Sequence, residues 1–373
     1  MKRIGVTALL IFLFVCATPG HPLFAQEKQW KKHLTAAESA DQQGRYAQAE
    51  QLYLAALQEA EKFGPSDLRL ATSLNKIASL YCLRFRYAEA EPLLQRALRT
   101  AEKALGPEHP DLAYHLSNLA VIYSAQGKYA EAEPLLQRAL RISEKTLGPE
   151  HLPAHASPAH AFDVLYPPAG VLCAGIVLFL DNLAAVYKEQ GKYAEAEPLY
   201  QRVLRIEEKA HGPDSFGIVR TLANLAAVYQ KQGKYTEAEL LYRRALHNQE
   251  EDRTFGSLSV VRQLINLAEL YIDQGKYAEA EPLLQEALRD IETRGLSIQL
   301  NDLAALYEKQ GRYAEAEPLY QRALRIQEKD YGPEHPVLAD TLLNYAKVLR
   351  KTGREGEAAK METRAEAIRT KHR

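Results

Sequence analysis

Hydrophobic residues recur through most of the chain with the 3.6-residue spacing that places side chains on one face of a helix. One such stripe consists of Leu222, Leu225, Ala226 and Tyr229, and the next consists of Tyr235, Ala238, Leu241, Tyr242, Ala245 and Leu246. Gly233 separates the two stripes, and glycine ends helices because it adopts the left-handed conformation at low cost. The pattern therefore predicts two antiparallel helices joined by a short turn at Gly233.

This helix pair is one copy of a unit that is repeated along the chain. Residues 127–135 and 191–199 both read GKYAEAEPL. A tyrosine opens each predicted second helix: Tyr46, Tyr87, Tyr129, Tyr193, Tyr235, Tyr277 and Tyr313. These tyrosines are 41, 42, 64, 42, 42 and 36 residues apart, and a degenerate eighth copy begins near Gly353. A period of this length predicts an all-α solenoid of stacked helix pairs rather than separate globular domains.

Prolines and glycines mark the boundaries of the predicted helices. A proline stands near the start of five second helices: Pro92, Pro134, Pro198, Pro282 and Pro318. We expect each proline to cost at most one hydrogen bond, because few N–H groups have partners there. In the segments 106–110 and 332–336 (GPEHP), glycine would end one helix and the second proline would open the next.

Two segments depart from this pattern towards the C-terminus. The short step removes six residues between Arg289 and Leu303, which predicts a truncated linker at residues 294–295. The polar segment 354–373 predicts a capping hairpin that solvates the end of the array.

Composition excludes several classes of function. The 373 residues include 47 Lys and Arg against 48 Asp and Glu, a formal net charge of −1, which argues against non-specific nucleic-acid binding. Three cysteines are too few for a disulfide scaffold or a structural zinc domain. No nucleophile elbow, phosphate-binding glycine loop or zinc-protease motif is present, so the sequence predicts no enzyme, no cofactor and no small-molecule substrate.

The first 25 residues have the layout of an export signal. Lys2 and Arg3 precede an uncharged apolar run, residues 4–17, that is shorter than a membrane span. We expect cleavage after Ala25, with cleavage after Ala17 as the alternative, and a periplasmic or secreted mature chain. An uncleaved segment would instead anchor the chain in the inner membrane. Cys16 suggests a lipoprotein only weakly, because Val15 and Phe14 are larger than the residues that lipoprotein signals use.

The repeated motif resembles a known family. Residues 183–204 contain Leu-Ala-x-x-Tyr, then Gly-x-Tyr, an alanine three residues later and a closing leucine. This resembles the tetratricopeptide repeat, with Val203 in a place where alanine is usual. The 42-residue length and the GPEHP loop are most similar to the kinesin-light-chain subclass. The resemblance covers about residues 30 to 370 and implies a right-handed superhelix over residues 26–373, with about eight helix pairs. It also implies an inner groove that binds peptides or protein segments.

The residues of that groove follow from the helical wheel of the first helices. With the leucine of Leu-Ala-x-x-Tyr numbered position 7, positions 2, 5, 6, 9, 12 and 13 point away from the core. The predicted groove residues are Asn118, Asn182, Lys188, Arg220, Asn224, Gln230, Lys231, Arg262, Asn266, Asp302, Lys309 and Asn344. Side-chain amides suit an extended backbone because each donates and accepts, and the Arg and Lys residues favour an acidic or carboxylate-bearing ligand. An equally weighted alternative is that the asparagines are copied residues that bond to neighbouring helices.

The long step predicts an irregular insertion at about residues 152–178. Its apolar run, residues 164–180, is cut by Pro167 and Pro168 and is too short to span a membrane. We interpret the insertion as a lengthened first helix with an apolar patch, as a loop over the groove, or as a sequence scrambled by compensating frameshifts in the gene. His151, His155 and His160 do not predict a metal site, because no carboxylate or cysteine cluster supports them.

Cys82 and Cys173 lie on first helices two units apart, about 20 Å from each other, which excludes a disulfide between them. Burial of Cys82 as a small apolar residue is expected.

The sequence therefore predicts a non-enzymatic protein-interaction scaffold that is exported and binds a peptide or protein segment. The alternative is a membrane-associated cell-envelope assembly component that docks through the apolar insertion or an uncleaved anchor. The sequence specifies neither the partner nor an oligomeric state.

Overall fold

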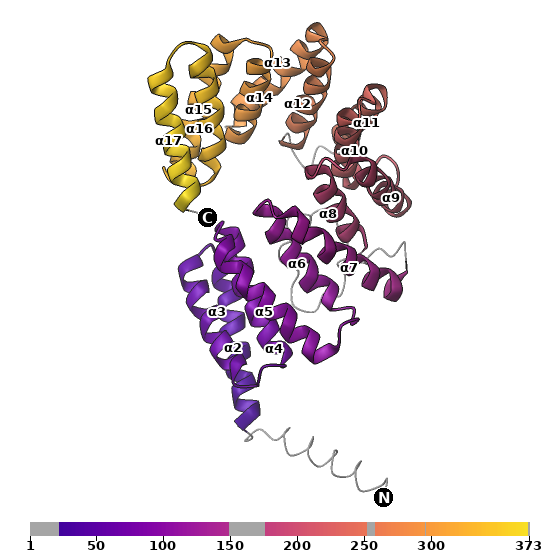
Figure 1. Ribbon diagram of the computed structural model, residues 1–373, viewed down its shortest axis with the longest axis vertical. Helices are drawn as coiled ribbons and strands as arrows, with labels where there is room; N and C mark the ends of the chain where they lie inside the picture. Colours follow the sequence, from indigo (N-terminus) through magenta and orange to yellow (C-terminus); the bar gives the residue numbers. More distant parts are fainter. Residues whose placement is uncertain (1–21, 149–175, 252–257, 295, 372–373) are drawn as a thin grey trace, which may run out of the picture. The chain divides into compact units, whose positions relative to one another are not determined.

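The computed structural model describes residues 22–148, 176–251, 258–294 and 296–371. Within these ranges the chain forms sixteen α-helices and one short 3₁₀ helix, and no strand (Figure 1). The predicted all-α fold is confirmed.

The helices alternate as first and second members of successive repeats. The first helices are α2 (Pro22–Gln42), α4 (Leu68–Leu83), α6 (Leu112–Ala125), α8 (Ile176–Glu189), α10 (Val219–Lys231), α12 (Leu258–Asp273), α14 (Ser297–Lys309) and α16 (Val337–Lys351). The second helices are α3 (Tyr46–Glu61), α5 (Tyr87–Leu105), α7 (Tyr129–Leu147), α9 (Tyr193–His211), α11 (Tyr235–Glu251), α13 (Tyr277–Arg294), α15 (Tyr313–Tyr331) and α17 (Glu355–Lys371). The 3₁₀ helix η3 (Phe216–Ile218) precedes α10.

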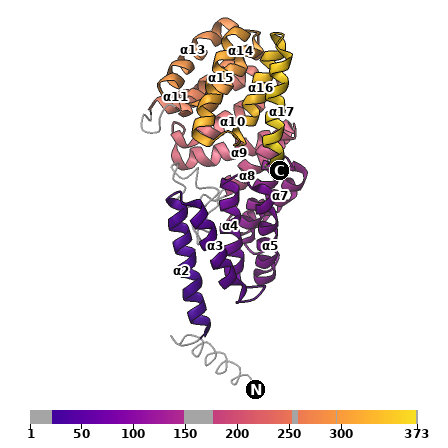
Figure 2. The same cartoon turned by 90° about the vertical axis from the view of Figure 1, so that its left-hand side faces the viewer.

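The described residues divide into two compact units, 22–148 with 176–179, and 180–371. In unit 1, α2 packs on α3, α4 on α5 and α6 on α7, and each pair contacts the next (Figures 1 and 2). In unit 2, α10 packs on α11, α12 on α13, α14 on α15 and α16 on α17, again with each pair contacting the next. Successive first helices of unit 2 also touch one another, from α10 through α12 and α14 to α16.

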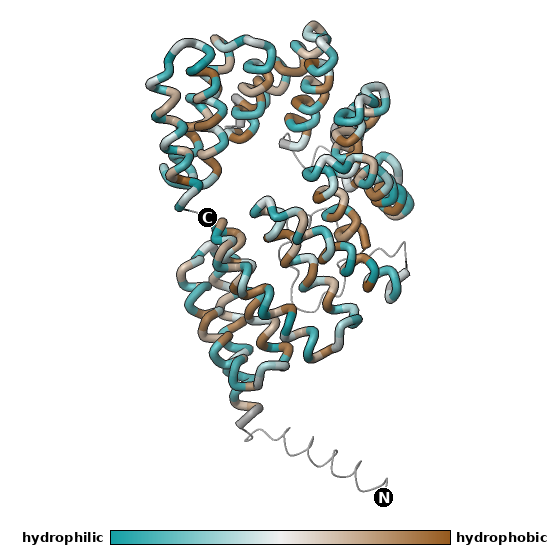
Figure 3. The backbone as a smooth tube through the Cα atoms, in the orientation of Figure 1, coloured by the Kyte–Doolittle hydropathy of each residue, from teal (hydrophilic) through white to brown (hydrophobic). Residues whose placement is uncertain are grey.

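The core of each repeat consists of small and large apolar residues that alternate between the two helices. Leu225 and Ala226 are buried as predicted, as are Ala238 and Tyr242 on the facing helix. Figure 3 shows the result as hydrophobic segments alternating with hydrophilic ones along each helix. The prediction of burial was wrong for one residue of the stripe, Tyr235. Tyr235 is exposed, because it is the first residue of α11 and lies at the end of the packed face.

Glycine ends the helices in two ways. Gly233 follows α10 with φ +77°, the left-handed conformation that the sequence predicted. Gly332 follows α15 with φ 90° and ψ 162°, a region that only glycine populates readily. In the loop after Gly332, the ring nitrogen Nδ1 of His335 accepts a hydrogen bond from the N–H of Val337 at 3.3 Å. The loop histidine therefore caps the helix that follows, which the sequence did not suggest.

The prolines of the second helices lie slightly deeper than expected. Pro92 is the sixth residue of α5, in the second turn rather than the first. It therefore removes one regular helical hydrogen bond, the cost that the sequence predicted for a proline in this region.

The predicted export signal and insertion fall largely outside the described residues. Residues 1–21 and 149–175 are not described, so these predictions and the histidines of the insertion are not tested. The end of the apolar run begins α8, where Ile176, Phe179 and Leu180 are buried. Across the described ranges, none of the helices combines the length and hydrophobicity needed to cross a membrane.

Cys82 is buried in unit 1, as expected. Burial raises the pKa of its thiol to about 12, which makes the residue an unreactive core side chain. Cys173 lies outside the described residues.

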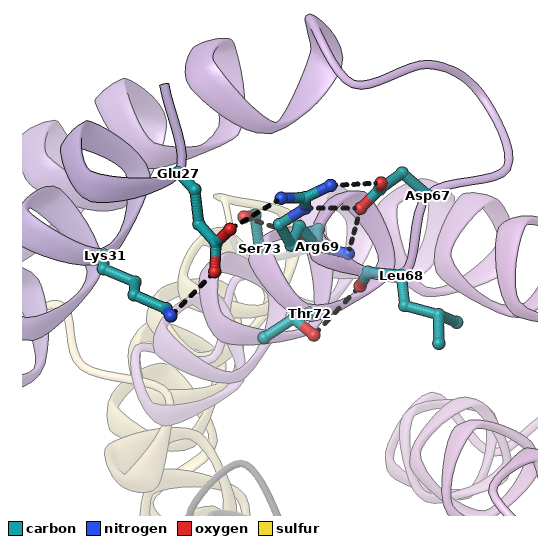
Figure 4. Close-up of polar contacts among 7 residues, drawn as sticks. All are labelled: Glu27, Lys31, Asp67, Leu68, Arg69, Thr72 and Ser73. Carbon is teal, nitrogen blue, oxygen red and sulfur yellow. Dashed lines mark hydrogen bonds and ion pairs between the residues drawn. The ribbon is translucent and has the colours of Figure 1, made fainter. Parts of the chain in front are cut away.

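Polar contacts fix the start of α4 against α2 in unit 1. The Asp67 carboxylate accepts hydrogen bonds from the backbone N–H of Arg69 at 2.9 Å and from the Arg69 guanidinium at 2.8 and 2.7 Å (Figure 4). This bonding lowers the pKa of Asp67, with the Arg69 side chain as the largest cause. Arg69 also lies 3.6 Å from Glu27 of α2, and Trp30 of α2 donates to Ser73 at 2.9 Å. These contacts set the packing of the first two repeats.

Candidate functional site

The first helices of unit 2 present one continuous face, because each contacts the next. We call the outward positions of α10, α12, α14 and α16 the first-helix face. The helices of this face carry most of the predicted groove residues: Arg220, Asn224, Gln230, Lys231, Arg262, Asn266, Asp302, Lys309 and Asn344. The structure brings these residues together on neighbouring helices, but their side chains differ in how strongly they are held.

Arg220 and Asp181 form an ion pair at one end of this face. The Arg220 guanidinium lies 2.5 Å from the Asp181 carboxylate on the preceding first helix, α8. Half of the Arg220 side chain is exposed, whereas only 12% of the Asp181 side chain is. Desolvation disfavours the charge on Arg220, but Asp181 outweighs it, so the pKa of Arg220 is raised. Arg220 is therefore a permanent cation that water reaches.

Further exposed charges lie on α10 and on the next two first helices. Lys231 of α10 and Arg262 of α12 are exposed, and Asn224 of α10 is half-buried. Asp302 of α14 is also exposed, and desolvation raises its pKa, with Arg262 acting in the opposite direction.

Four predicted groove residues are held by other side chains. Gln230 is buried, donates to Asp273 at 2.6 Å and accepts from the Tyr242 hydroxyl at 3.2 Å. Lys309 pairs with Asp273 and, at 3.5 Å, with Glu269. Asn344 donates to Asn301 at 3.3 Å and accepts from Lys347 at 3.0 Å, while Asn266 donates to Gln263 at 3.4 Å. For Gln230 and Asn344 these bonds match the structural alternative for the polar ladder.

The remaining predicted groove residues lie outside that face. Asn118 is half-buried in α6 of unit 1, and its Nδ2 has no hydrogen-bond partner among the described residues. Asn182 and Lys188 belong to α8, where Lys188 lies 3.6 Å from Glu189.

A contact ladder that the sequence reasoning missed joins successive repeats. At five joints, the cation before a second helix pairs with the fifth residue of the preceding second helix. The pairs are Arg86–Glu50, Lys128–Glu91, Lys234–Glu197, Arg312–Glu281 and Arg354–Glu317. In the middle of unit 2, Lys234 also lies 5.1 Å from the centre of the Tyr229 ring, and Gln201 donates to the Tyr229 hydroxyl at 3.0 Å. We call this set of contacts the inter-repeat ladder.

The ladder distinguishes the two acidic residues near the start of α9. Glu195 is exposed in the first turn, but Glu197 is bound by Lys234 at 2.7 Å and by Gln201 at 3.1 Å. Although desolvation acts to raise it, the pKa of Glu197 is lowered overall by these partners. The signal in the sequence is the basic residue that precedes each of the seven anchor tyrosines.

A second set of arginines ties the loops to the second helices. Arg244 pairs with Glu208 at 2.7 Å and donates to the carbonyl of Pro213 at 2.6 Å. The same arrangement recurs as Arg138 with Glu102 and Pro107, and as Arg364 with Glu328 and Pro333. These arginines are the tenth residues of their helices, and the tenth residue of α13 is Glu286 instead.

Buried polar residues lie where each second helix meets the next first helix. We call them the polar seam, and its first-helix members occupy position 3: Ser73, His115, Thr221, Gln263, Gln299 and Thr341. Glu207 and Gln327 are the matching residues of α9 and α15. Thr221 donates to the Glu207 carboxylate at 2.7 Å. Burial raises the pKa of Glu207 to about 7, against the opposing effects of Thr221 and Arg220.

The outer face of α17 differs from that of the other second helices. The other second helices carry glutamate at the fifth residue and most carry glutamine at the ninth, whereas α17 carries Ala359 and Thr363. Glu366 replaces the leucine found at the twelfth residue. A shallow, open depression is lined by Leu343 of α16 and by residues of α17, among them Thr363 and Glu366. The side chains that would hold a further repeat are therefore absent from α17, in keeping with the predicted polar end.

Three buried tyrosines of the second helices differ in whether their hydroxyl groups have a hydrogen-bond partner. Tyr242 and Tyr320 are buried and donate to Gln230 and Glu308 at 3.2 Å, whereas the Tyr200 hydroxyl has no partner among the described residues. The twelfth residue before Tyr200 is Lys188, which cannot accept a hydrogen bond.

We expect Tyr200→Phe to leave the free energy of unfolding unchanged or to increase it, because an orphaned buried hydroxyl is removed. Tyr242→Phe should lower it by about 1 kcal/mol or more, because Gln230 loses its donor. Chemical denaturation of both variants measures the difference. Equal losses for both would show that the Tyr200 hydroxyl does have a partner.

Within the described residues, no group of three or more His, Cys, Asp or Glu side chains converges as a metal site would require.

Comparison with known proteins agrees with this architecture. Tetratricopeptide repeat models match residues 32–103, 69–145, 176–251 and 296–371, and another model with the same description matches residues 260–293. A search of curated proteins found no significant match.

Three solved structures that are similar to this chain have sequence identities of 17 to 24%. BtubC (BKLC) from P. vanneervenii is 21% identical, with a TM-score of 0.50 over 73% of this chain and 93% of that one. The quorum sensor NprR from B. thuringiensis is 17% identical, with a TM-score of 0.57 over 90% of this chain and 86% of that one. Kinesin light chain TPR-like repeats from Podosopora anserina are 24% identical, with a TM-score of 0.45 over 60% of this chain and 98% of that one.

The structural likeness concerns the fold, and the sequence models cover most of the chain. Together with the paired helices and the repeated glycine and tyrosine positions, they show that this chain belongs to the tetratricopeptide repeat family.

Proposed function

We propose that the first-helix face of unit 2 binds an extended segment of another protein and that the chain acts as a non-enzymatic scaffold. Membership of a family that generally serves as interaction scaffolds supports a protein or peptide partner. The observation that carries the proposal is the row of polar side chains around Asn224, Arg262 and Asp302, which is open to water and faces away from the core. A row of this kind can pair with the N–H and C=O groups of an extended backbone.

The charges of the face favour a ligand with an acidic group. Arg220, Lys231 and Arg262 are exposed on neighbouring helices. Asp181 and Asp302 lie beside the two arginines and limit the net positive charge, so a single carboxylate suits the face better than a polyanion.

The double variant Asn224→Ala with Asn266→Ala tests the face directly. We expect weaker ligand binding with little loss of thermal stability, because Asn224 is half-buried and Asn266 makes one long hydrogen bond of 3.4 Å. Partners captured by crosslinking in the native cell supply the ligand, and titration calorimetry measures its affinity.

Asn344→Ala is the matched control for this test. It removes an asparagine that bonds to both Asn301 and Lys347, so it should lower the melting temperature. A collapse in melting of the double variant would show that Asn224 and Asn266 are structural and would remove the proposal for this face.

Export to the periplasm or the medium remains part of the proposal and rests on the pattern of residues 1–25. Cell fractionation tests it. Release of the chain with the soluble periplasmic extract supports export, and retention in the membrane pellet supports the alternative of an envelope component held by an uncleaved anchor.

A further inference from the structure

Four residues of unit 2 form a charged cluster that the repeat pattern does not explain. Glu207 of α9 is 8% exposed and accepts a hydrogen bond from Thr221 of α10 at 2.7 Å. Arg220, the neighbour of Thr221 in sequence, projects to the first-helix face and pairs with Asp181 of α8. The buried Glu207 carboxylate is therefore hydrogen-bonded to the residue next to Arg220, and both Arg220 and Asp181 act on it electrostatically.

The charged groups that act on Glu207 come from two of the neighbouring helices, α8 and α10. Asp181 on α8 is a like charge, and Arg220 on α10 is an opposite charge. The 3₁₀ helix η3, which contacts α9, consists of Phe216, Gly217 and Ile218 and contributes no charge. With Glu207 ionised the cluster carries one net negative charge, and with Glu207 protonated it is neutral.

No other joint described in unit 2 has this arrangement. The corresponding residue of α15 is Gln327, which is 1% exposed and lies 14 residues before the buried Thr341, as Glu207 lies 14 residues before Thr221. Glutamine suits the seam and carries no charge. The carboxylate at residue 207 is therefore not needed to fill the space.

We propose that Glu207 makes the binding of an anionic ligand group at Arg220 dependent on proton uptake, so that the first-helix face binds such a ligand more tightly when Glu207 is protonated. This inference rests on the proposed function of the face and concerns its regulation.

Electrostatics give the sign of the effect. Since burial raises the pKa of Glu207 to about 7, its protonation changes near neutral pH. An anion beside Arg220 repels the ionised carboxylate and thereby favours its protonated form. By reciprocity, protonation of Glu207 strengthens anion binding to the same degree. Affinity is thus highest below pH 7 and falls as the pH rises through 7.

The test uses the whole chain and a defined probe. Dodecapeptides are selected from a random phage-displayed library at pH 6, and the tightest acidic, histidine-free peptide is synthesised. Its affinity is measured between pH 6 and pH 8.5 for the wild type, for Glu207→Gln and for Glu195→Gln. Glu195→Gln is the matched control, because it removes the same charge from an exposed position of the same helix.

We expect the wild type and Glu195→Gln to lose about tenfold in affinity across this range, the order of effect that one nearby charge has in a partly buried site. Glu207→Gln should bind equally well at every pH. Calorimetry in two buffers of different ionisation enthalpy should show proton uptake near pH 7 by the wild type and none by Glu207→Gln.

Three outcomes would overturn the inference. The same pH profile for the wild type and Glu207→Gln would remove it while leaving peptide binding at the face intact. Binding that Arg220→Gln does not weaken would place the ligand elsewhere. Failure of every library peptide to bind the wild type would refute the proposed function itself, and this inference with it.

Discussion

Glu207→Gln is expected to raise the free energy of unfolding at pH 8 by about 3 kcal/mol while changing it little at pH 4.5. Burial raises the pKa of Glu207 from 4.5 to about 7 in the folded state. Between these values the unfolded chain ionises while the folded chain keeps the proton, so stability falls as the pH rises from 4.5 through 7. Each unit of pKa difference corresponds to about 1.4 kcal/mol. Glutamine removes this loss and still accepts the hydrogen bond of Thr221.

Thermal unfolding at pH 4.5 and pH 8 checks this prediction, with an increase of several degrees expected for the variant at pH 8 only. Glu195→Gln is again the control and should change neither value appreciably, because its carboxylate is exposed. An equal gain for Glu207→Gln at both pH values would mean that packing, rather than ionisation, limits this joint.

His115→Gln, in unit 1, is expected to raise the free energy of unfolding in acid. This pH dependence is opposite to the one expected for Glu207→Gln. Burial lowers the pKa of His115 to about 4, with Asp111 acting against this shift. The ring nitrogen Nδ1 lies 2.8 Å from Nδ2 of Asn75 and can accept a hydrogen bond only while it is unprotonated. The wild type therefore keeps its full stability above pH 6.5 and loses about 3 kcal/mol as the pH falls to 4.

Glutamine suits residue 115 because Gln263 and Gln299 occupy the same position of the polar seam in unit 2. Denaturant titrations at pH 7.5 and pH 4.5 should show that the variant gains stability over the wild type at pH 4.5 but not at pH 7.5. His109→Gln, in the loop before α6, is the control. The same difference between variant and wild type at both pH values would contradict the burial of a neutral His115.

The fold could be predicted because apolar periodicity and glycine placement are local signals. The turn at Gly233 and the buried pair Leu225 and Ala226 follow from the spacing within one helix pair. Tyr235 was assigned to the core because the pattern does not show where a helix leaves the packed face.

The contacts between repeats were missed because they join residues about 37 positions apart. Lys234 and Glu197 meet only when the relative rotation of two successive helix pairs is known. Helical periodicity ranks both residues as solvent-facing. The polar seam was missed for a similar reason, since Thr221 and Glu207 are polar residues in a buried joint.

For the candidate site, the sequence selected the outward face of the first helices but not the state of each side chain. Gln230 and Lys231 are adjacent in sequence, yet Gln230 is buried against Tyr242 and Lys231 is exposed. The difference arises because position 12 turns towards the neighbouring second helix. Ligand contact by the exposed residues stays a prediction.

The inter-repeat ladder also affects how such a chain can change its length. An interior copy carries both halves of the joint, a cation at its turn and a glutamate in its second helix, as Arg312 and Glu317 do. Duplication or deletion of one such copy would therefore leave a cation facing a glutamate at the new junction. Helix α17 carries Ala359 in place of that glutamate, so it could not supply this half of the joint to a following repeat.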